Sequence, residues 1–182
     1  MRHVQAAVDE ARARELLNRG WGALLRSLVR PRNAERKFEL IWMPAYLITI
    51  GMRSTQGLSE LTCFVDGCSG SFALFDMHDA IVDEDFESKT FAKTVDQGVA
   101  QSIAREEIVK VILRRRSRAG KPIPETTKDI ELLSYPYWVY YYQRRGGLVD
   151  IRVLDAATGR PVGNKIRLGV LDAFKAAAHA TD

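Results

Sequence analysis

Two stretches of the chain have the same layout: FELIWMPAYLITI at positions 38–50 and IELLSYPYWVYYY at positions 130–142. Each has Glu-Leu at its second and third positions, a proline at its seventh, and large apolar residues after it. Pro44 and Pro136 are 92 positions apart, and Tyr46 corresponds to Trp138 at the same spacing. Because a repeat determines the architecture of a whole chain, this alignment is the starting point for the fold.

The similarity extends to both sides of these stretches. FVDGCSGS at 64–71 aligns with VLDAATGR at 153–160, and the change of spacing from 92 to 89 falls in the intervening turn, where insertions cost little free energy. Three matches carry this extension: Asp66 with Asp155, Gly70 with Gly159, and Val8-Asp9 with Val95-Asp96. Each copy therefore reads as helix, linker, strand, turn, strand and an Asp-x-x-x-Gly turn.

Apolar spacing and end signals predict the helices. One stripe at helical spacing marks the first helix, at Leu17, Trp21, Leu24 and Leu28. The second helix opens with the capping-box spacing of Thr94 to Gln97 and ends at Gly120 and Pro122. A short closing helix is expected to turn Val170, Leu171 and Phe174 inward.

The repeated element order predicts an α+β fold with two layers, built from tandem duplicated helix–β-meander units that pack pseudo-symmetrically, with a short C-terminal helix. We expect the first unit at 1–90 and the second at 91–182, with 76–90 as the connector. The prolines are expected near strand starts, because a proline in mid-sheet lacks the N–H of the ladder. The units could share one sheet or stack two sheets face to face.

The hairpin that ends in VLDAATGR resembles the hairpin of PepSY-like domains, whose strand often finishes in an Asp-Ala-x-Thr-Gly turn. Asp155, Ala156, Thr158 and Gly159 match that turn. The first copy keeps its aspartate and its second glycine. The resemblance implies a small helix-plus-sheet module that binds or regulates.

Composition excludes several classes of protein. The 182 residues carry a net charge of +4, which permits acidic partners without requiring them. No apolar stretch approaches the roughly 20 residues that a membrane span needs, and the N-terminus has no apolar signal-peptide core. Cys63 and Cys68 are too few for a disulfide framework or a complete zinc site. We expect a full-length cytoplasmic protein.

The motifs for enzymatic chemistry are incomplete. The acidic run at 76–87, with His78, could hold a hard cation but lacks the spaced ligands and the glycine of a calcium loop, so a solvated connector is favoured. GCSGS departs from the Gly-x-Ser-x-Gly nucleophile elbow, and the three histidines are scattered. We therefore expect no enzyme, no cofactor and no metal.

The aromatic strand suggests a binding surface. Alternation puts Trp138, Tyr140 and Tyr142 on one face, which the repeat assigns to the helix-facing core. The other face needs a cover, either the other half of the chain or a second subunit. The favoured hypothesis is a non-enzymatic protein-binding or assembly module that forms a homodimer. Its candidate partner-binding residues are Tyr135, Tyr137, Tyr141, Arg144 and Arg145.

A basic cluster supports an alternative, a nucleic-acid-associated protein in which arginines contact phosphates and rings stack on bases. Its candidate residues are Arg114, Arg115, Arg116, Arg118 and Lys121. The structural interpretation of the same cluster is a solvated helix end, where cations are favourable to the helix dipole. A third hypothesis is an enzyme whose site assembles only in the folded chain.

Overall fold

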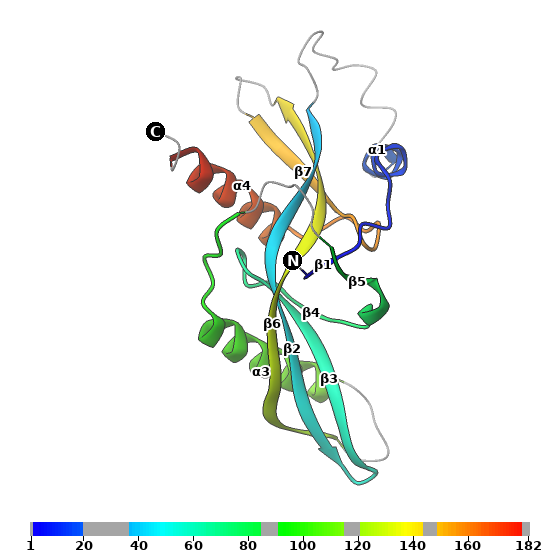
Figure 1. Ribbon diagram of the computed structural model, residues 1–182, viewed down its shortest axis with the longest axis vertical. Helices are drawn as coiled ribbons and strands as arrows, with labels where there is room; N and C mark the ends of the chain where they lie inside the picture. Colours follow the sequence, from blue (N-terminus) through cyan, green and yellow to red (C-terminus); the bar gives the residue numbers. More distant parts are fainter. Residues whose placement is uncertain (1, 20–36, 85–90, 115–120, 144–148, 180–182) are drawn as a thin grey trace.

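The computed structural model describes residues 2–19, 37–84, 91–114, 121–143 and 149–179, and it shows an elongated α+β molecule (Figure 1). Within these ranges the chain forms three α-helices, one 3-10 helix and seven strands. In chain order they are β1 (Arg2–Val4), α1 (Glu10–Arg19), β2 (Phe38–Ser54), β3 (Gly57–Asp66), β4 (Phe72–Leu74), η1 (His78–Ala80), β5 (Ile81–Asp83), α3 (Gln97–Arg114), β6 (Ile123–Gln143), β7 (Val149–Asp155) and α4 (Asn164–His179).

The seven strands form one mixed open sheet in the order β4-β3-β2-β6-β1-β5, and β7 pairs with the upper part of β6. Strands β2 and β6 are antiparallel and run along the length of the molecule (Figure 1). Strand β3 continues the sheet beside β2, and β7 continues it beside β6. Of the two arrangements that the sequence left open, the chain therefore has a single shared sheet.

The β2–β6 ladder keeps one register from Phe38–Tyr140 to Thr49–Asp129. In this register Met43 pairs with Tyr135 and Ile48 with Ile130. Most of these positions are β-branched, aromatic or long apolar residues, which favour a pleated strand that is covered on both faces.

The prolines lie in mid-strand, so the prediction that they stand near strand starts is wrong. The carbonyl of Pro44 accepts a hydrogen bond from the Gly67 N–H at 2.8 Å, and that of Pro136 accepts one from the Ala156 N–H at 3.1 Å. In an antiparallel strand the N–H and C=O of one residue point to the same side. The missing proline N–H therefore faces the point where β3 or β7 has already ended, and the β2–β6 ladder loses no donor.

Strands β3 and β7 end in turns with the same hydrogen bonds. The Oδ1 of Asp66 accepts from the N–H of Cys68 and Ser69, and the Oδ1 of Asp155 accepts from the N–H of Ala157 and Thr158. Gly70 and Gly159 close the turns at φ of 63° and 70°, a left-handed conformation that favours glycine. The predicted Asp-x-x-x-Gly turns are thus present at both strand ends.

Helices α3 and α1 cover one face of the sheet, in its lower and upper halves respectively (Figure 1). Helix α3 buries a line of small and branched side chains against β2 and β3: Ala100, Ala104, Ile108 and Ile112. Helix α1 buries Ala13 against Trp138, Leu154 and Ala156 of the second half. Each helix therefore packs against the hairpin that it does not directly precede in the chain.

The two helices are held by equivalent contacts. The Val95 N–H donates to the Gly67 carbonyl and the Tyr46 hydroxyl donates to the Val95 carbonyl, both at 2.9 Å. In the other half, the Val8 N–H donates to the Ala156 carbonyl at 3.0 Å and Trp138 Nε1 donates to the Val8 carbonyl at 2.7 Å. An aromatic side chain of the sheet thus fixes the start of each helix.

The opposite face of the sheet is covered by the chain's own C-terminal helix and connector. Val170 and Ala173 of α4 pack on it together with Phe75 and Phe91, over a layer that includes Tyr137. The sequence had offered the other half or a second subunit as the cover. The strands of both halves lie side by side in one sheet, so this face is not covered by the other half's sheet, and α4 packs on it instead.

The helix ends differ in part from expectation. Asp9 caps α1, since its Oδ1 accepts from the Arg12 N–H at 2.7 Å. The hydroxyl of Thr94 donates to the Cys68 carbonyl, so it joins the helix start to the Asp66 turn. Trp21, Leu24 and Leu28 of the predicted first stripe lie outside the described residues. Among the helices described, none is long and apolar enough to cross a membrane.

Candidate functional site

The aromatic residues of β6 that we predicted as a partner surface lie mostly in the interior. Tyr135 and Tyr137 are 4% and 1% exposed, and their rings are 5.3 Å apart. The Tyr135 hydroxyl donates to Asp155 Oδ2 at 3.0 Å, and the Tyr137 hydroxyl bonds to Asp66. Burial, strengthened by the neighbouring carboxylates, holds the pKa of both phenols above the ordinary value.

These two tyrosines therefore join the Asp66 and Asp155 turns beneath α4. Asp66 is 2% exposed, and burial raises its pKa although the turn's N–H groups and the Tyr137 hydroxyl act in the opposite direction. The turn and the two phenols supply the hydrogen bonds that buried polar groups require. The arrangement stabilises the centre of the sheet, and both tyrosines are buried in the cluster that includes Val170 and Ala173 of α4.

Tyr141 is the exception, since it lies half-buried at the rim between β6 and α4. Its hydroxyl donates to Glu39, which also forms an ion pair with Lys37 at 2.7 Å. Its ring contacts Phe174 edge-on at a centroid distance of 5.8 Å. Arg144 and Arg145 lie outside the described residues, so their predicted role at this rim stays a prediction.

Two members of the predicted basic cluster are described. Arg114 is exposed at the end of α3, and the Nζ of Lys121 donates to the Leu113 carbonyl at 2.8 Å. Lys121 therefore caps the last turn of the helix, as the helix-end interpretation requires. The remaining members, Arg115, Arg116 and Arg118, lie outside the described residues.

The acidic connector does not gather into a metal centre in the part of the chain that is described. His78 packs edge-on against Phe75, and no group of three or more candidate ligands occurs among the described residues. Asp85 and Glu87 lie outside them. The cation hypothesis for this run stays a prediction.

The two cysteines have weakly acidic thiols. Burial raises the pKa of Cys63 to about 12, and burial together with the charge of Asp66 raises that of Cys68 to about 12. Both thiols point at main-chain carbonyls, those of Ile48 and Ala92. Since the thiolate is the nucleophile, neither cysteine is prepared for catalysis at neutral pH.

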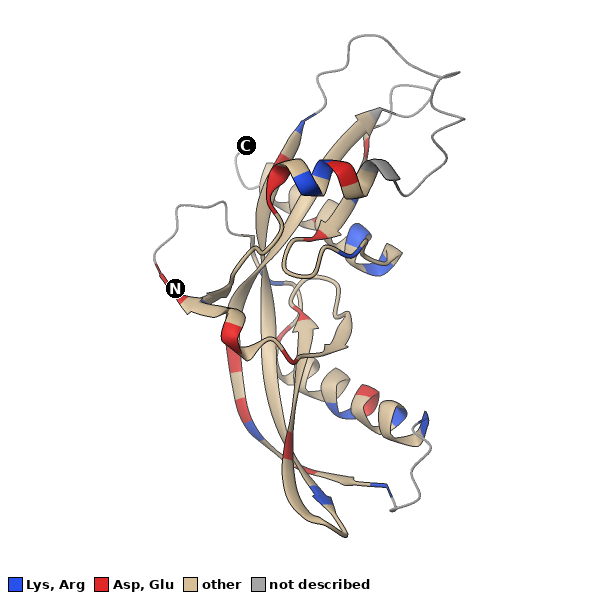
Figure 2. Ribbon diagram, turned by 90° about the vertical axis from the view of Figure 1, so that its right-hand side faces the viewer, with Lys and Arg blue, Asp and Glu red and all other residues tan. Residues whose placement is uncertain are grey.

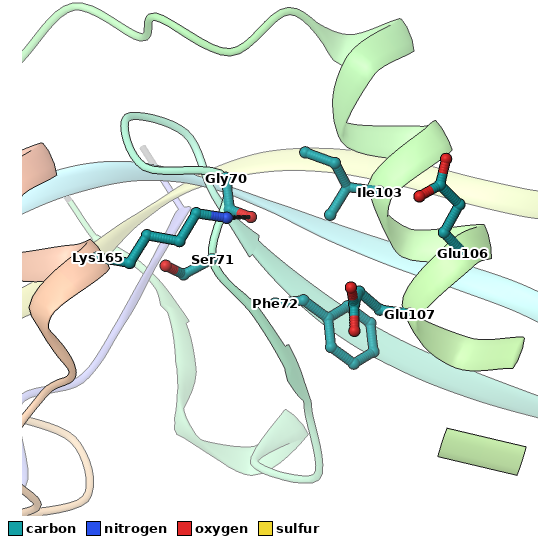
Figure 3. Close-up of a pocket in the computed structure, with 7 residues that line it drawn as sticks. All are labelled: Gly70, Ser71, Phe72, Ile103, Glu106, Glu107 and Lys165. Atoms are coloured by element: carbon teal, nitrogen blue, oxygen red, sulfur yellow. Dashed lines mark hydrogen bonds between the residues drawn. The ribbon is translucent and has the colours of Figure 1, made fainter. Parts of the chain in front are cut away.

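A groove of about 330 Å³ lies between the Asp66 turn, α3 and the start of α4 (Figure 3). Lys165 extends from α4 on one side, and Glu106 and Glu107 lie on the other (Figure 3). The Nζ of Lys165 donates to the Gly70 carbonyl at 2.8 Å, and Glu107 pairs with Lys110 at 2.7 Å. Opposite charges face each other across the groove, and Lys165 and Glu107 already have partners. The groove therefore favours no ligand of either sign.

The open edge of β3 is a feature that the sequence analysis missed. Strand β4 pairs with Cys63 to Val65, and the Phe75 N–H donates to the Thr62 carbonyl at 3.0 Å. Below Thr62, the segment Gly57–Leu61 has β2 as its neighbour on one side and no strand on the other among the described residues. A polar turn at Thr55-Gln56 was the available signal for this hairpin.

Comparison with known proteins finds no family model, no curated protein and no solved structure that matches this chain. The PepSY-like resemblance of the hairpin and its turn therefore stays a prediction.

Proposed function

We propose that this chain is a non-enzymatic protein-binding or assembly module, made of two related halves, that adds a partner's strand to the open edge of β3. The first part of this proposal, duplication, is supported by the β2–β6 ladder. Met43 and Tyr135 pair directly in that ladder and are 92 positions apart, the same spacing that relates Pro44 to Pro136. A twofold relation between two copies requires that equivalent residues meet at its centre.

Contacts away from the centre support the same relation. Val8, Trp138 and Ala156 make the bonds that Val95, Tyr46 and Gly67 make in the other half. The sequence alignment had already matched these positions at spacings of 87, 92 and 89. The three spacings come from different parts of the alignment, and the residues that they match make the same hydrogen bonds in both halves. Coincidence between unrelated hairpins does not readily explain this agreement.

The observation that carries the binding proposal is the edge at Gly57–Leu61, where no described strand pairs with the outer side of β3. Ser54 pairs with Gly57 across a two-residue turn, so alternate residues of β3 direct their N–H and C=O groups toward β2. The Thr62 carbonyl accepts its bond from Phe75, on the side away from β2. By alternation, the main-chain groups of Leu58 and Glu60 also point away from β2. Their main-chain groups face outward where a partner's strand could pair.

The usual protections of an edge strand are missing from this segment. It contains neither lysine nor proline, and its charged residue, Glu60, is drawn back across the sheet by Lys128 of β6 at 2.7 Å. Gly51 of β2 lies between them, and a Cβ there would stand 3.2 Å from the Lys128 Cε. Leu58 is 72% exposed. Open edges of this kind pair with other chains unless they are blocked.

The test replaces Glu60 with proline in the full-length chain. Proline removes an outward N–H without removing a bond to β2, so Glu60→Pro should fold and lose partner capture. Glu60→Ala removes the same carboxylate but keeps the N–H, and it is the matched control. Immobilised wild-type and Glu60→Ala chains should retain a second copy or a cellular protein that Glu60→Pro does not retain. Equal retention by all three chains would overturn the edge as the binding surface.

A further inference from the structure

A second surface lies at the lower end of the molecule, where the tip of the β2–β3 hairpin, the end of α3 and the start of β6 come together (Figure 1). Arg53 of β2 pairs with Leu58 on one side and with Ile123 on the other, so the three side chains share one row of the sheet. Leu58 is 72% exposed and Ile123 is 66% exposed. Lys121 connects this row to α3 through its bond to the Leu113 carbonyl.

The same end combines exposed aliphatic side chains with positive charge. Leu113, next to Arg114 at the end of α3, is 60% exposed. Figure 2 shows basic segments at the end of α3, at the start of β6 and near the tip of the hairpin. Two ion pairs at this end, Glu125 with Arg53 and Glu60 with Lys128, offset acid against base and leave the charges of Arg114 and Lys121. In sequence, three further arginines stand between Arg114 and Lys121, outside the described residues.

We propose that this end of the molecule docks onto an anionic membrane surface, with Leu58 and Ile123 entering the interface and Arg114 and Lys121 facing the lipid headgroups. Peripheral binding of this kind needs both an apolar and an electrostatic contribution, because either one alone gives marginal affinity. Each basic residue near an anionic leaflet contributes roughly 1 kcal/mol, or about fivefold in affinity. The elongated shape presents these residues end-on.

The exposed side chains favour a lipid surface over nucleic acid. Single-stranded nucleic acid is bound by aromatic rings on which the bases stack. The large exposed side chains at this end are leucine and isoleucine, and the tyrosines of β6 lie in the interior or at the other end. Aliphatic side chains gain most from entering the acyl boundary of a bilayer.

The test is sedimentation of the full-length chain with vesicles of phosphatidylcholine, with and without about 30% phosphatidylserine. We expect binding to the anionic vesicles that weakens steeply at about 0.5 M salt, and little binding to phosphatidylcholine alone. Leu58→Ser with Ile123→Ser should lower the affinity about tenfold or more. Arg114→Gln with Lys121→Gln should lower it about 25-fold, from fivefold for each charge.

Two controls make the result specific. Val149→Ser removes an apolar side chain that is 65% exposed at the opposite end of the sheet, and it should leave vesicle binding unchanged. Glu60→Pro should also bind vesicles, which separates this surface from strand addition. Absence of binding to anionic vesicles would overturn the proposal. So would a shift of duplex or single-stranded DNA that survives Leu58→Ser with Ile123→Ser, because nucleic acid would then be the ligand of the basic residues.

Discussion

Asp66 shows how one residue serves a turn and the core together. Its carboxylate accepts the N–H groups that a tight turn leaves without partners, and it also bonds to the hydroxyl of Tyr137 in β6. Asp155 does the same with Tyr135. The turn role was predictable from the Asp-x-x-x-Gly pattern. The tyrosine partners were not, because they lie 71 and 20 positions away along the chain from Asp66 and Asp155 respectively.

Replacing Asp66 should separate its two roles. Asp66→Ala leaves two N–H groups of the turn without an acceptor and should lower the free energy of unfolding by about 1–3 kcal/mol. Asp66→Asn keeps an acceptor oxygen and should cost clearly less. Urea unfolding at neutral pH measures both, and equal losses in the two variants would contradict the assigned role.

The contribution of Asp66 to the free energy of unfolding should depend on pH with a definite sign. Burial raises the folded-state pKa of Asp66 above 3.8, so its contribution favours folding most below that pH and is lost as pH rises through the raised pKa. Asp66→Asn has no charge to bury, so its stability relative to wild type should increase between about pH 4 and pH 7. Urea titrations at both values provide the test, and a relative decrease would contradict burial as the dominant cause.

At the scale of the element, the long strands and the helices were recognisable from local patterns, and their packing was not. Alternation identified the face of Tyr46, Ile48 and Ile50 as the one that a helix covers, which is confirmed. Sequence order suggested that each helix covers the hairpin that follows it. The opposite pairing occurs because each helix is fixed by the turn residue of the other half, Gly67 or Ala156.

The contact between Tyr46 and the start of α3 should be measurable. Tyr46→Phe keeps the ring but leaves the Val95 carbonyl without its donor, so we expect a loss of about 1–2 kcal/mol in unfolding free energy. Tyr140→Phe is the matched control, because the Tyr140 hydroxyl has no hydrogen bond among the described residues, and it should change stability by less than about 0.5 kcal/mol. Similar effects of the two substitutions on the urea midpoint would argue against the contact.

At the scale of the whole molecule, the shared sheet makes the two halves interdependent. Strands β2 and β6 pair from Phe38–Tyr140 to Arg53–Ile123, and each half supplies the helix that covers the other. Neither the range 1–90 nor the range 91–182 can then bury its apolar faces without its counterpart. The sequence boundaries describe the proposed repeat better than they describe separate folding units.

One cooperative transition should follow from that arrangement. Thermal or urea unfolding, followed by far-ultraviolet circular dichroism and by tryptophan fluorescence, should give coincident curves with one midpoint. Trp42 and Trp138 belong to different halves, so separate unfolding would split the fluorescence curve. Two resolved transitions would show that the halves fold independently.

The sequence alone determined the α+β class, the two Asp-x-x-x-Gly turns and the sheet face that α1 and α3 cover, because these depend on side-chain periodicity and on turn chemistry within a few residues. The tertiary structure decided how the prolines are accommodated, because tolerance of a missing N–H depends on where the neighbouring strand ends. It also decided that α4 packs in the same cluster as Tyr135 and Tyr137, and that no described strand pairs with the outer side of Gly57–Leu61. Pairing and burial bring together residues far apart in the chain, and no local pattern specifies which element will arrive.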